Sequence, residues 1–373
     1  MYGVKKELCF ESKFSMSVLS FLTKARLKKY KTTAKNKIIS NKTIYNKIIT
    51  NTIIPQNTLF LLLKMIKYFR GVAMYHKLSD DLFKQFGCKV YKLAISGGMT
   101  CPVRDGKIHS KGCIFCSQDG SGSFCEKSTD DIDKEIENAK LRVKNKIKNG
   151  KYIAYFQDFT NTYAPVDYLE KIFTKAITHP DIVALSIATR PDCLPNDVLK
   201  LLEKLSKIKP VWVELGLQTI HPTTAEYIRR GYTLHVFDKA VKDLKKIDIT
   251  VIVHIILGLP YETKEMMYET VKYVGKSGVD GVKLQLLHVL KNTDLEKEYL
   301  NGKFECLTMD EYIEILENCI KILPKEITIH RLTGDGAKKD LIAPLWSADK
   351  KRVLNTVNNA FKRDNIIQGS IKI

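Results

Sequence analysis

Three cysteines with close, uneven spacing are the residues of this chain best suited to chemistry. Cys101, Cys113 and Cys116 follow the pattern Cys-x11-Cys-x2-Cys in a loop that opens with two glycines. Three thiolates in one loop can hold a soft metal ion or an iron–sulfur cluster. A cubic cluster with only three thiolates keeps one iron open for a small molecule, as catalytic metal sites keep an open position. The loop also fits a structural zinc site in which His109 is the fourth ligand.

The elements that must position this loop are visible as short apolar runs separated by amphipathic segments. Nearly continuous apolar runs predict parallel strands with both faces buried. We expect six strands, at residues 90–95, 152–157, 182–188, 211–216, 250–257 and 281–288. The segments between them predict helices, at residues 130–147, 166–177, 195–208, 223–230, 236–247 and 264–276.

Strands that alternate with helices predict an α/β fold, here a partial (β/α)6 TIM-like barrel, because the array is too short for eight units. Its active site is expected at the carboxyl ends of the strands, where the cysteine loop lies. After about residue 290 the pattern becomes mostly helical, with a helix at 309–323 and a strand-like run at 327–332. We therefore expect a core domain over 74–290 and a mostly helical C-terminal extension over 291–373.

The charge of the chain is strongly positive and unevenly distributed. It has 61 Lys and Arg against 41 Asp and Glu, a net charge of +20, and residues 1–73 carry 13 Lys and 2 Arg against 2 Glu, a net of +13. Such a surplus favours acidic partners, which include RNA, DNA, nucleotides and anionic membrane surfaces. Residues 1–73 have no steady period and predict a poorly ordered N-terminal extension, with a nucleic-acid-binding arm as the alternative.

Several classes of protein are excluded by composition. No apolar run reaches the roughly 18–20 residues that cross a bilayer, so we expect no membrane association. The apolar stretch at 14–22 has no small-residue cleavage site after it, and nine cysteines are too few and too irregular for a disulfide scaffold. These features predict a cytoplasmic protein.

The three-cysteine loop after the first strand of a six-unit βα array resembles the radical S-adenosylmethionine (SAM) superfamily. The spacing differs from the commonest one, Cys-x3-Cys-x2-Cys, and is similar to a bacterial branch related to the catalytic subunit of Elongator. Further stretches match that branch, at residues 155–165, 188–192, 214–219, 257–260 and 343–346. The resemblance covers about residues 74–350.

The resemblance implies both cofactors and a substrate. Cys101, Cys113 and Cys116 would hold a [4Fe–4S] cluster, whose open iron would bind SAM. Electrons from an external donor such as flavodoxin or ferredoxin would cleave SAM to methionine and a 5′-deoxyadenosyl radical. Members of the branch modify wobble uridine, so tRNA is the implied partner.

It also implies eight residues that contact SAM. Residues 157–162 stand where the superfamily usually has a Gly-Gly-Glu turn, although a capped turn would also use such residues. The carboxylate of Glu214, in the fourth strand, suits the hydroxyls of the SAM ribose. Arg190, after the third strand, suits the SAM carboxylate or an ion pair with Asp192. The predicted contacts are Gln157, Asp158, Thr160, Asn161, Arg190, Glu214, Gln218 and Gly258.

Two other functions fit the same residues. One is a zinc-stabilised nucleic-acid-binding protein without catalysis, and the other is a radical SAM enzyme that acts on a protein or a small metabolite. Analysis of the protein for iron and acid-labile sulfide distinguishes a zinc-stabilised binding protein from a radical SAM enzyme. Comparison of the modified nucleosides in tRNA from a deletion strain and from wild type tests whether the substrate is tRNA or another molecule.

Overall fold

The computed structural model describes residues 74–118, 120, 125, 131–147, 150–334 and 336–372. The extension predicted over residues 1–73 lies outside the described residues. Residues 73–373 form one compact unit. No helix in the described part of the chain is long and apolar enough to cross a membrane.

A single curved sheet of seven strands organises the fold, and every neighbouring pair in it is parallel. Its strands, in spatial order, are β1 (Val90–Ile95), β2 (Lys151–Phe156), β3 (Ile182–Thr189), β4 (Val211–Gln218), β5 (Thr250–Leu257), β6 (Gly281–Leu286) and β8 (Thr328–Arg331). The predicted partial barrel is confirmed. The C-terminal extension supplies β8 as an additional strand, so the barrel stays open between β1 and β8.

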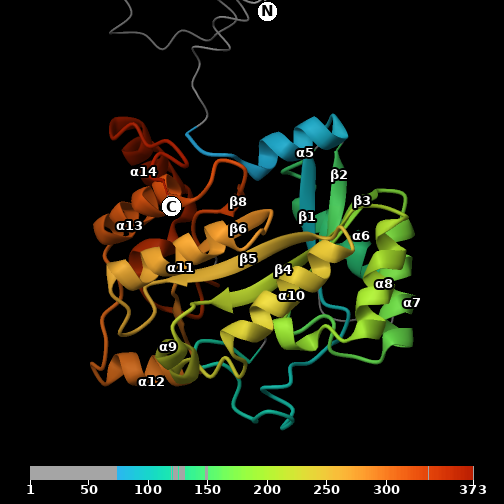
Figure 1. Ribbon diagram of the computed structural model, residues 1–373, viewed down its shortest axis with the longest axis horizontal. Helices are drawn as coiled ribbons and strands as arrows, with labels where there is room; N and C mark the ends of the chain where they lie inside the picture. Colours follow the sequence, from blue (N-terminus) through green and yellow to red (C-terminus); the bar gives the residue numbers. More distant parts are fainter. Residues whose placement is uncertain are drawn as a thin grey trace, which may run out of the picture. The chain divides into compact units, whose positions relative to one another are not determined.

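Helices lie around the outside of the sheet (Figure 1). Between the strands run α6 (Ile132–Val143), α7 (Val166–Thr178), α8 (Asn196–Ser206), α9 (Pro222–Tyr227), α10 (Leu234–Lys246) and α11 (Lys264–Lys276). The C-terminal extension adds α12 (Asp294–Leu300), α13 (Met309–Ile322), α14 (Lys350–Arg363) and β9 (Leu341–Ala343), which pairs antiparallel with β7 (Val289–Leu290) at the end of the core. The helical C-terminal region is therefore confirmed.

Alternating side chains of the strands form two cores. Those that point outward, such as Leu93 and Val253, are buried beneath the helices in the main core. Those that point inward near the start of the strands, such as Trp212 and Ile252, pack with Leu82 of α5 (Leu78–Phe86). This second cluster closes the amino end of the barrel and leaves the carboxyl end for the site.

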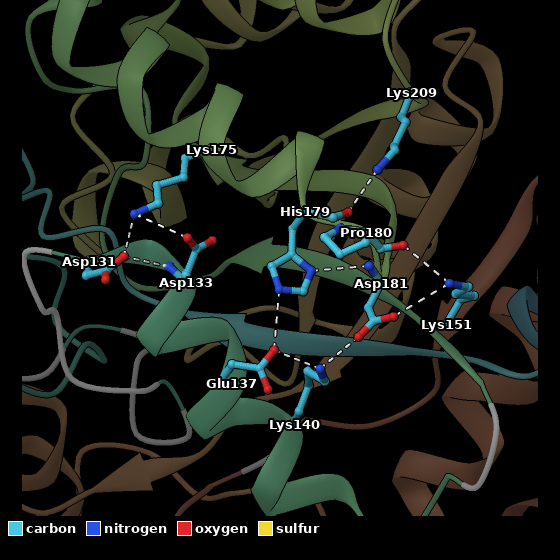
Figure 2. A network of polar contacts seen from close by, with 10 residues as sticks. All are labelled: Asp131, Asp133, Glu137, Lys140, Lys151, Lys175, His179, Pro180, Asp181 and Lys209. Atoms are coloured by element: carbon cyan, nitrogen blue, oxygen red, sulfur yellow. Dashed lines mark hydrogen bonds and ion pairs between the residues drawn. The ribbon is translucent and has the colours of Figure 1, made fainter.

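An exposed network of ion pairs fixes α6 against its neighbours (Figure 2). Lys140 on α6 pairs with Glu137 at 2.7 Å and with Asp181, just before β3, at 2.8 Å. Lys175 on α7 pairs with Asp131, the residue that caps α6, at 2.5 Å. Exposed pairs contribute little each, about 0–1 kcal/mol, but together they set the position of α6 beside the open edge of the barrel.

Candidate active site

The cysteine loop follows β1 and is folded by its own backbone. The N–H of Arg104 donates to the carbonyl of Cys101 at 2.8 Å, and that of Cys116 donates to the carbonyl of Cys113 at 3.0 Å. Gly112 has a φ of 74°, which glycine adopts without a steric penalty. These turns bring Cys101 and Cys113, which have eleven residues between them in the sequence, back to one side of the loop.

All three cysteines line one cavity, of about 260 Å³, at the carboxyl ends of the strands. The other walls come from β2 to β6 and from β8. This is the position at which α/β barrels hold their active sites. The sequence prediction that the three thiols belong to a single site agrees with this placement.

The residues around the three thiols can be compared with the ligand sets of a zinc ion and of a cluster. Within the described ranges, no three His, Cys, Asp or Glu side chains are grouped closely enough to hold one metal ion. A zinc ion needs all its thiolate ligands about 2.3 Å from one centre, whereas a cluster spreads them over separate irons. His109, the fourth ligand of the zinc alternative, does not line the cavity. Three thiols that face one cavity match the ligand set of an iron–sulfur cluster with one open iron.

Burial controls the chemistry of the thiols. It raises the pKa of Cys113 to about 12 and also raises the pKa of Cys116, against the opposing effect of the Arg104 guanidinium. Arg104 donates to the carbonyl of Cys116 at 3.0 Å, and Thr160 donates from Oγ1 to Sγ of Cys101 at 3.2 Å. Without iron these two thiols are neutral, so iron binding must displace their protons.

Five of the eight residues predicted to contact SAM line the same cavity as the cysteines. They are Gln157, Thr160, Arg190, Glu214 and Gln218. Their placement beside the thiols is compatible with a cofactor role, which stays a prediction for each of them.

Arg190 is held rigidly at the rim of the site. Its Nε and Nη2 donate to the two carboxylate oxygens of Asp192 at 2.9 and 2.7 Å, and its Nη1 donates to the carbonyl of Arg230 at 2.8 Å. The ion pair with Asp192, one of the two interpretations drawn from the sequence, is therefore present. It orients the guanidinium while Arg190 still lines the cavity.

Asp158 and Asn161 do not line the cavity and instead frame it. The side-chain amide of Asn161 donates to the carbonyls of Phe156, Asp158 and Ala188 at 3.2, 2.7 and 2.8 Å, which ties the turn after β2 to β3. Asp158 accepts a hydrogen bond of 2.6 Å from Ser96. These contacts favour the capped-turn interpretation for both residues.

Gly258 also lies outside the cavity lining. Its φ is 85°, and an added Cβ would stand 2.9 Å from Leu307 of the C-terminal extension. The glycine allows the chain to turn after β5 and to approach that segment closely. Its contact with SAM stays a prediction.

A buried charge cluster forms the floor of the cavity. Glu214 is fully buried, and its carboxylate accepts hydrogen bonds from the ammonium groups of Lys92 and Lys283, from Ser186 at 2.7 Å and from His254 at 2.7 Å. The two ammonium groups hold the pKa of Glu214 well below its usual value in spite of burial. The sequence indicated that a buried carboxylate at this position needs a partner, and the SAM ribose was the expected one. In the structure, Lys92 and Lys283 are partners of Glu214.

The lysines and histidine of this floor are strongly perturbed. Burial lowers the pKa of Lys283 to about 7 and that of His254 to about 4. Lys283 also donates to the hydroxyl of Tyr155 at 3.0 Å. Sequence reasoning missed Lys92, Tyr155 and Lys283, although a charged residue at an inward position of an apolar strand was a usable signal.

Comparisons with known proteins identify the family. A model of the radical SAM superfamily matches residues 110–274, and a model of the radical SAM C-terminal domain matches residues 279–363. YtqA of Bacillus subtilis (strain 168) is 45% identical over 295 residues, which cover 79% of this chain and 92% of YtqA. The chain belongs to the radical SAM superfamily.

Within the superfamily the chain is similar to Elongator-related proteins. A tRNA uridine(34) acetyltransferase of Methanocaldococcus jannaschii is 31% identical over 157 residues, 41% of this chain and 28% of that protein. The solved structure of Methanocaldococcus infernus Elp3, with an N-terminal deletion, shares the fold with a TM-score of 0.59 and 19% identity, over 75% of this chain and 64% of that one.

This radical SAM protein is an enzyme whose cofactors are a [4Fe–4S] cluster and SAM. When bound, they supply reductive cleavage of the sulfonium to methionine and a 5′-deoxyadenosyl radical. Cys101, Cys113 and Cys116 line one cavity and would hold the cluster there, which stays a prediction, and the chain adds the charged floor beside them. The predicted alternative of a zinc-stabilised binding protein without catalysis is therefore wrong.

Proposed function

We propose that this radical SAM enzyme modifies the wobble-uridine side chain of tRNA. The supporting observation is its relationship to an archaeal tRNA uridine(34) acetyltransferase. The alignment covers 28% of that protein, so the proposal takes from it the target nucleotide and not the acetyl transfer.

The charge of the chain supports a polyanionic substrate. The net charge is +20, and positively charged proteins attract RNA through its phosphates. A protein or a small metabolite as substrate would not require this surplus. Lys92 and Lys283 bring two basic side chains to one carboxylate at the inner end of the cavity.

The core and the C-terminal extension have different roles in this function. The core over residues 74–290 holds the cluster and SAM, and the extension over 291–373 adds β8 to the open barrel and supplies one wall of the site. An external one-electron donor such as flavodoxin or ferredoxin reduces the cluster.

The direct experiment compares modified nucleosides in bulk tRNA from wild-type and deletion strains by mass spectrometry. We expect one wobble-uridine derivative to disappear and its precursor to accumulate. Wild-type protein and Cys306→Ala should restore the derivative, because Cys306 lies outside the cavity, whereas Cys113→Ala should not. Identical nucleoside profiles would contradict the tRNA proposal and favour a protein or metabolite substrate.

A further inference from the structure

A second hollow lies behind the cysteine loop. It has a volume of about 790 Å³, and its walls come from that loop, from the turns after β2 and β3, and from α10. We call it the outer hollow. No described residue lines both the outer hollow and the cavity of the active site, so the two are separate spaces.

The wall between the outer hollow and the active-site cavity is thin. In the cysteine loop, Cys101 lines the cavity and the next residue, Pro102, lines the outer hollow. After β3, Arg190 lines the cavity and Asp192 lines the outer hollow, and their ion pair of 2.7 Å crosses the wall. At these points the wall is only one or two residues thick, and one of the three predicted cluster ligands forms part of it.

The outer hollow has an apolar centre and basic side chains at its rim. Ile108 of the cysteine loop is 42% exposed and lines it together with Val236 of α10. Lys107 and Lys239 are exposed at the rim, and the ammonium group of Lys107 lies 5.3 Å from the centre of the Tyr163 ring. An apolar centre with a polar rim is typical of a surface that docks another protein.

The carboxylates of the outer hollow are neutralised by ion pairs. Asp192 accepts two hydrogen bonds from the guanidinium of Arg190, at 2.9 and 2.7 Å. Asp243 pairs with Lys239 at 2.6 Å and with Lys246 at 3.1 Å. Together with the exposed lysine of the cysteine loop, these groups have a positive net charge, which favours an acidic protein as the partner.

The reaction itself requires a protein that delivers electrons. Reductive cleavage of SAM consumes one electron, and the rate of electron transfer falls steeply with distance. A carrier must therefore dock where little protein separates it from the cysteines. The thin wall behind Cys101 meets this condition, and a carrier bound there does not occupy the cavity that SAM and the substrate need.

We propose that the outer hollow is the docking site of an acidic one-electron carrier protein. Ile108 contacts the apolar surface of the carrier, and Lys107 and Lys239 pair with its carboxylates. One electron crosses the wall, so that the carrier is oxidised and the cluster is reduced, and no bond forms or breaks. The docking requires the three cysteines as cluster ligands and does not depend on the nature of the substrate.

The test titrates the full-length holoenzyme with oxidised flavodoxin and, separately, with oxidised ferredoxin. A second readout is the amount of 5′-deoxyadenosine formed with the reduced carrier, divided by the amount formed with dithionite, a small reductant that needs no docking surface. The hollow variant is Lys107→Gln with Lys239→Gln. The control variant, Lys204→Gln with Lys207→Gln, removes two exposed charges at the end of α8. A charge-keeping variant is Lys107→Arg with Lys239→Arg.

We expect the hollow variant to bind the carrier about fivefold or more weakly at low salt, and the difference to shrink at high salt, because exposed charges are screened. The ratio of carrier-driven to dithionite-driven product should fall with it. The control and charge-keeping variants should stay within about twofold of wild type.

Three results would overturn the docking site. They are equal effects of the hollow and control variants, wild-type protein that binds neither carrier, and a hollow variant that loses affinity for tRNA but not for the carrier, which would make the rim an RNA surface. None of the carrier measurements uses tRNA, so their failure would leave the proposed function standing.

Discussion

Lys283 and Glu214 lie on β6 and β4, which are not neighbours in the sheet, and their side chains meet inside the barrel. Lys92 reaches the same carboxylate from β1, at the edge of the sheet. Only a strongly curved sheet brings these three strands to a common point. The charge cluster therefore depends on the partial barrel, and it also couples the floor of the active site to the stability of the fold.

Replacement of Glu214 by glutamine should be strongly destabilising. It leaves the ammonium groups of Lys92 and Lys283 buried without their carboxylate, and loss of one partner from a buried pair costs about 3–5 kcal/mol. The free energy of unfolding in guanidinium chloride measures this effect. Lys140→Gln, which removes a partly exposed cation from the network of Figure 2, should cost less than about 1 kcal/mol. Equal, small effects of both changes would contradict the account of the floor.

His254 should make stability depend on pH on the acid side. In the folded protein, burial and the positive charges of Lys283 and Arg331 lower the pKa of His254 from 6.5 to about 4, although Glu214 acts in the opposite direction. As the pH falls, the unfolded chain therefore binds this proton at a higher pH than the folded protein does. The free energy of unfolding should therefore fall by up to about 3 kcal/mol as the pH falls from 6.5 to 4. Unfolding curves across this range should show a smaller slope for His254→Gln, and an unchanged slope would show that another group titrates.

Thr160 should tune the cluster through Cys101. Its hydroxyl donates to Sγ of Cys101 inside the protein, and hydrogen bonds to cluster sulfurs raise the reduction potential. Thr160→Val should lower the potential measured by a spectroscopic redox titration and slow the formation of 5′-deoxyadenosine. Thr160→Ser, which keeps the hydroxyl, should behave as wild type. If valine and serine gave the same potential, the hydrogen bond would have no such role.

Arg190→Lys should weaken the use of SAM. Lysine keeps the positive charge but lacks the planar guanidinium group, which Asp192 orients through two hydrogen bonds. Loss of a charged hydrogen bond of about 1.5–3 kcal/mol corresponds to a KM for SAM roughly ten- to a hundredfold higher. Arg363→Lys, an exposed change on α14, is the matched control and should leave KM unchanged. A KM for Arg190→Lys equal to that of the control would remove Arg190 from the cofactor site.

Local signals in the sequence were sufficient for most of the elements. The apolar runs predicted β1 and β5 with the bounds that they have, and α11 likewise, because these elements are bounded by clear turns. The bounds of α6 were predicted too wide on both sides, since helix ends depend on caps such as Asp131 more than on periodicity.

The floor of the site was less accessible to sequence reasoning. Glu214 was singled out because a lone carboxylate in an apolar strand needs a partner, but its partners Lys92 and Lys283 lie 122 and 69 residues away in the chain. No local pattern pairs residues over such separations. The cysteine loop pointed to the family because its three cysteines are close in sequence and their side-chain chemistry is specific.

We propose that Cys101, Cys113 and Cys116 hold an iron–sulfur cluster that leaves one iron for SAM. Its most direct test is anaerobic reconstitution of the wild-type protein, followed by incubation with SAM and dithionite and assay of 5′-deoxyadenosine. The account predicts bound iron and acid-labile sulfide, a broad brown absorbance and formation of 5′-deoxyadenosine, all lost in Cys113→Ala and kept in Cys306→Ala. A colourless protein that holds one zinc ion and forms no 5′-deoxyadenosine would contradict it.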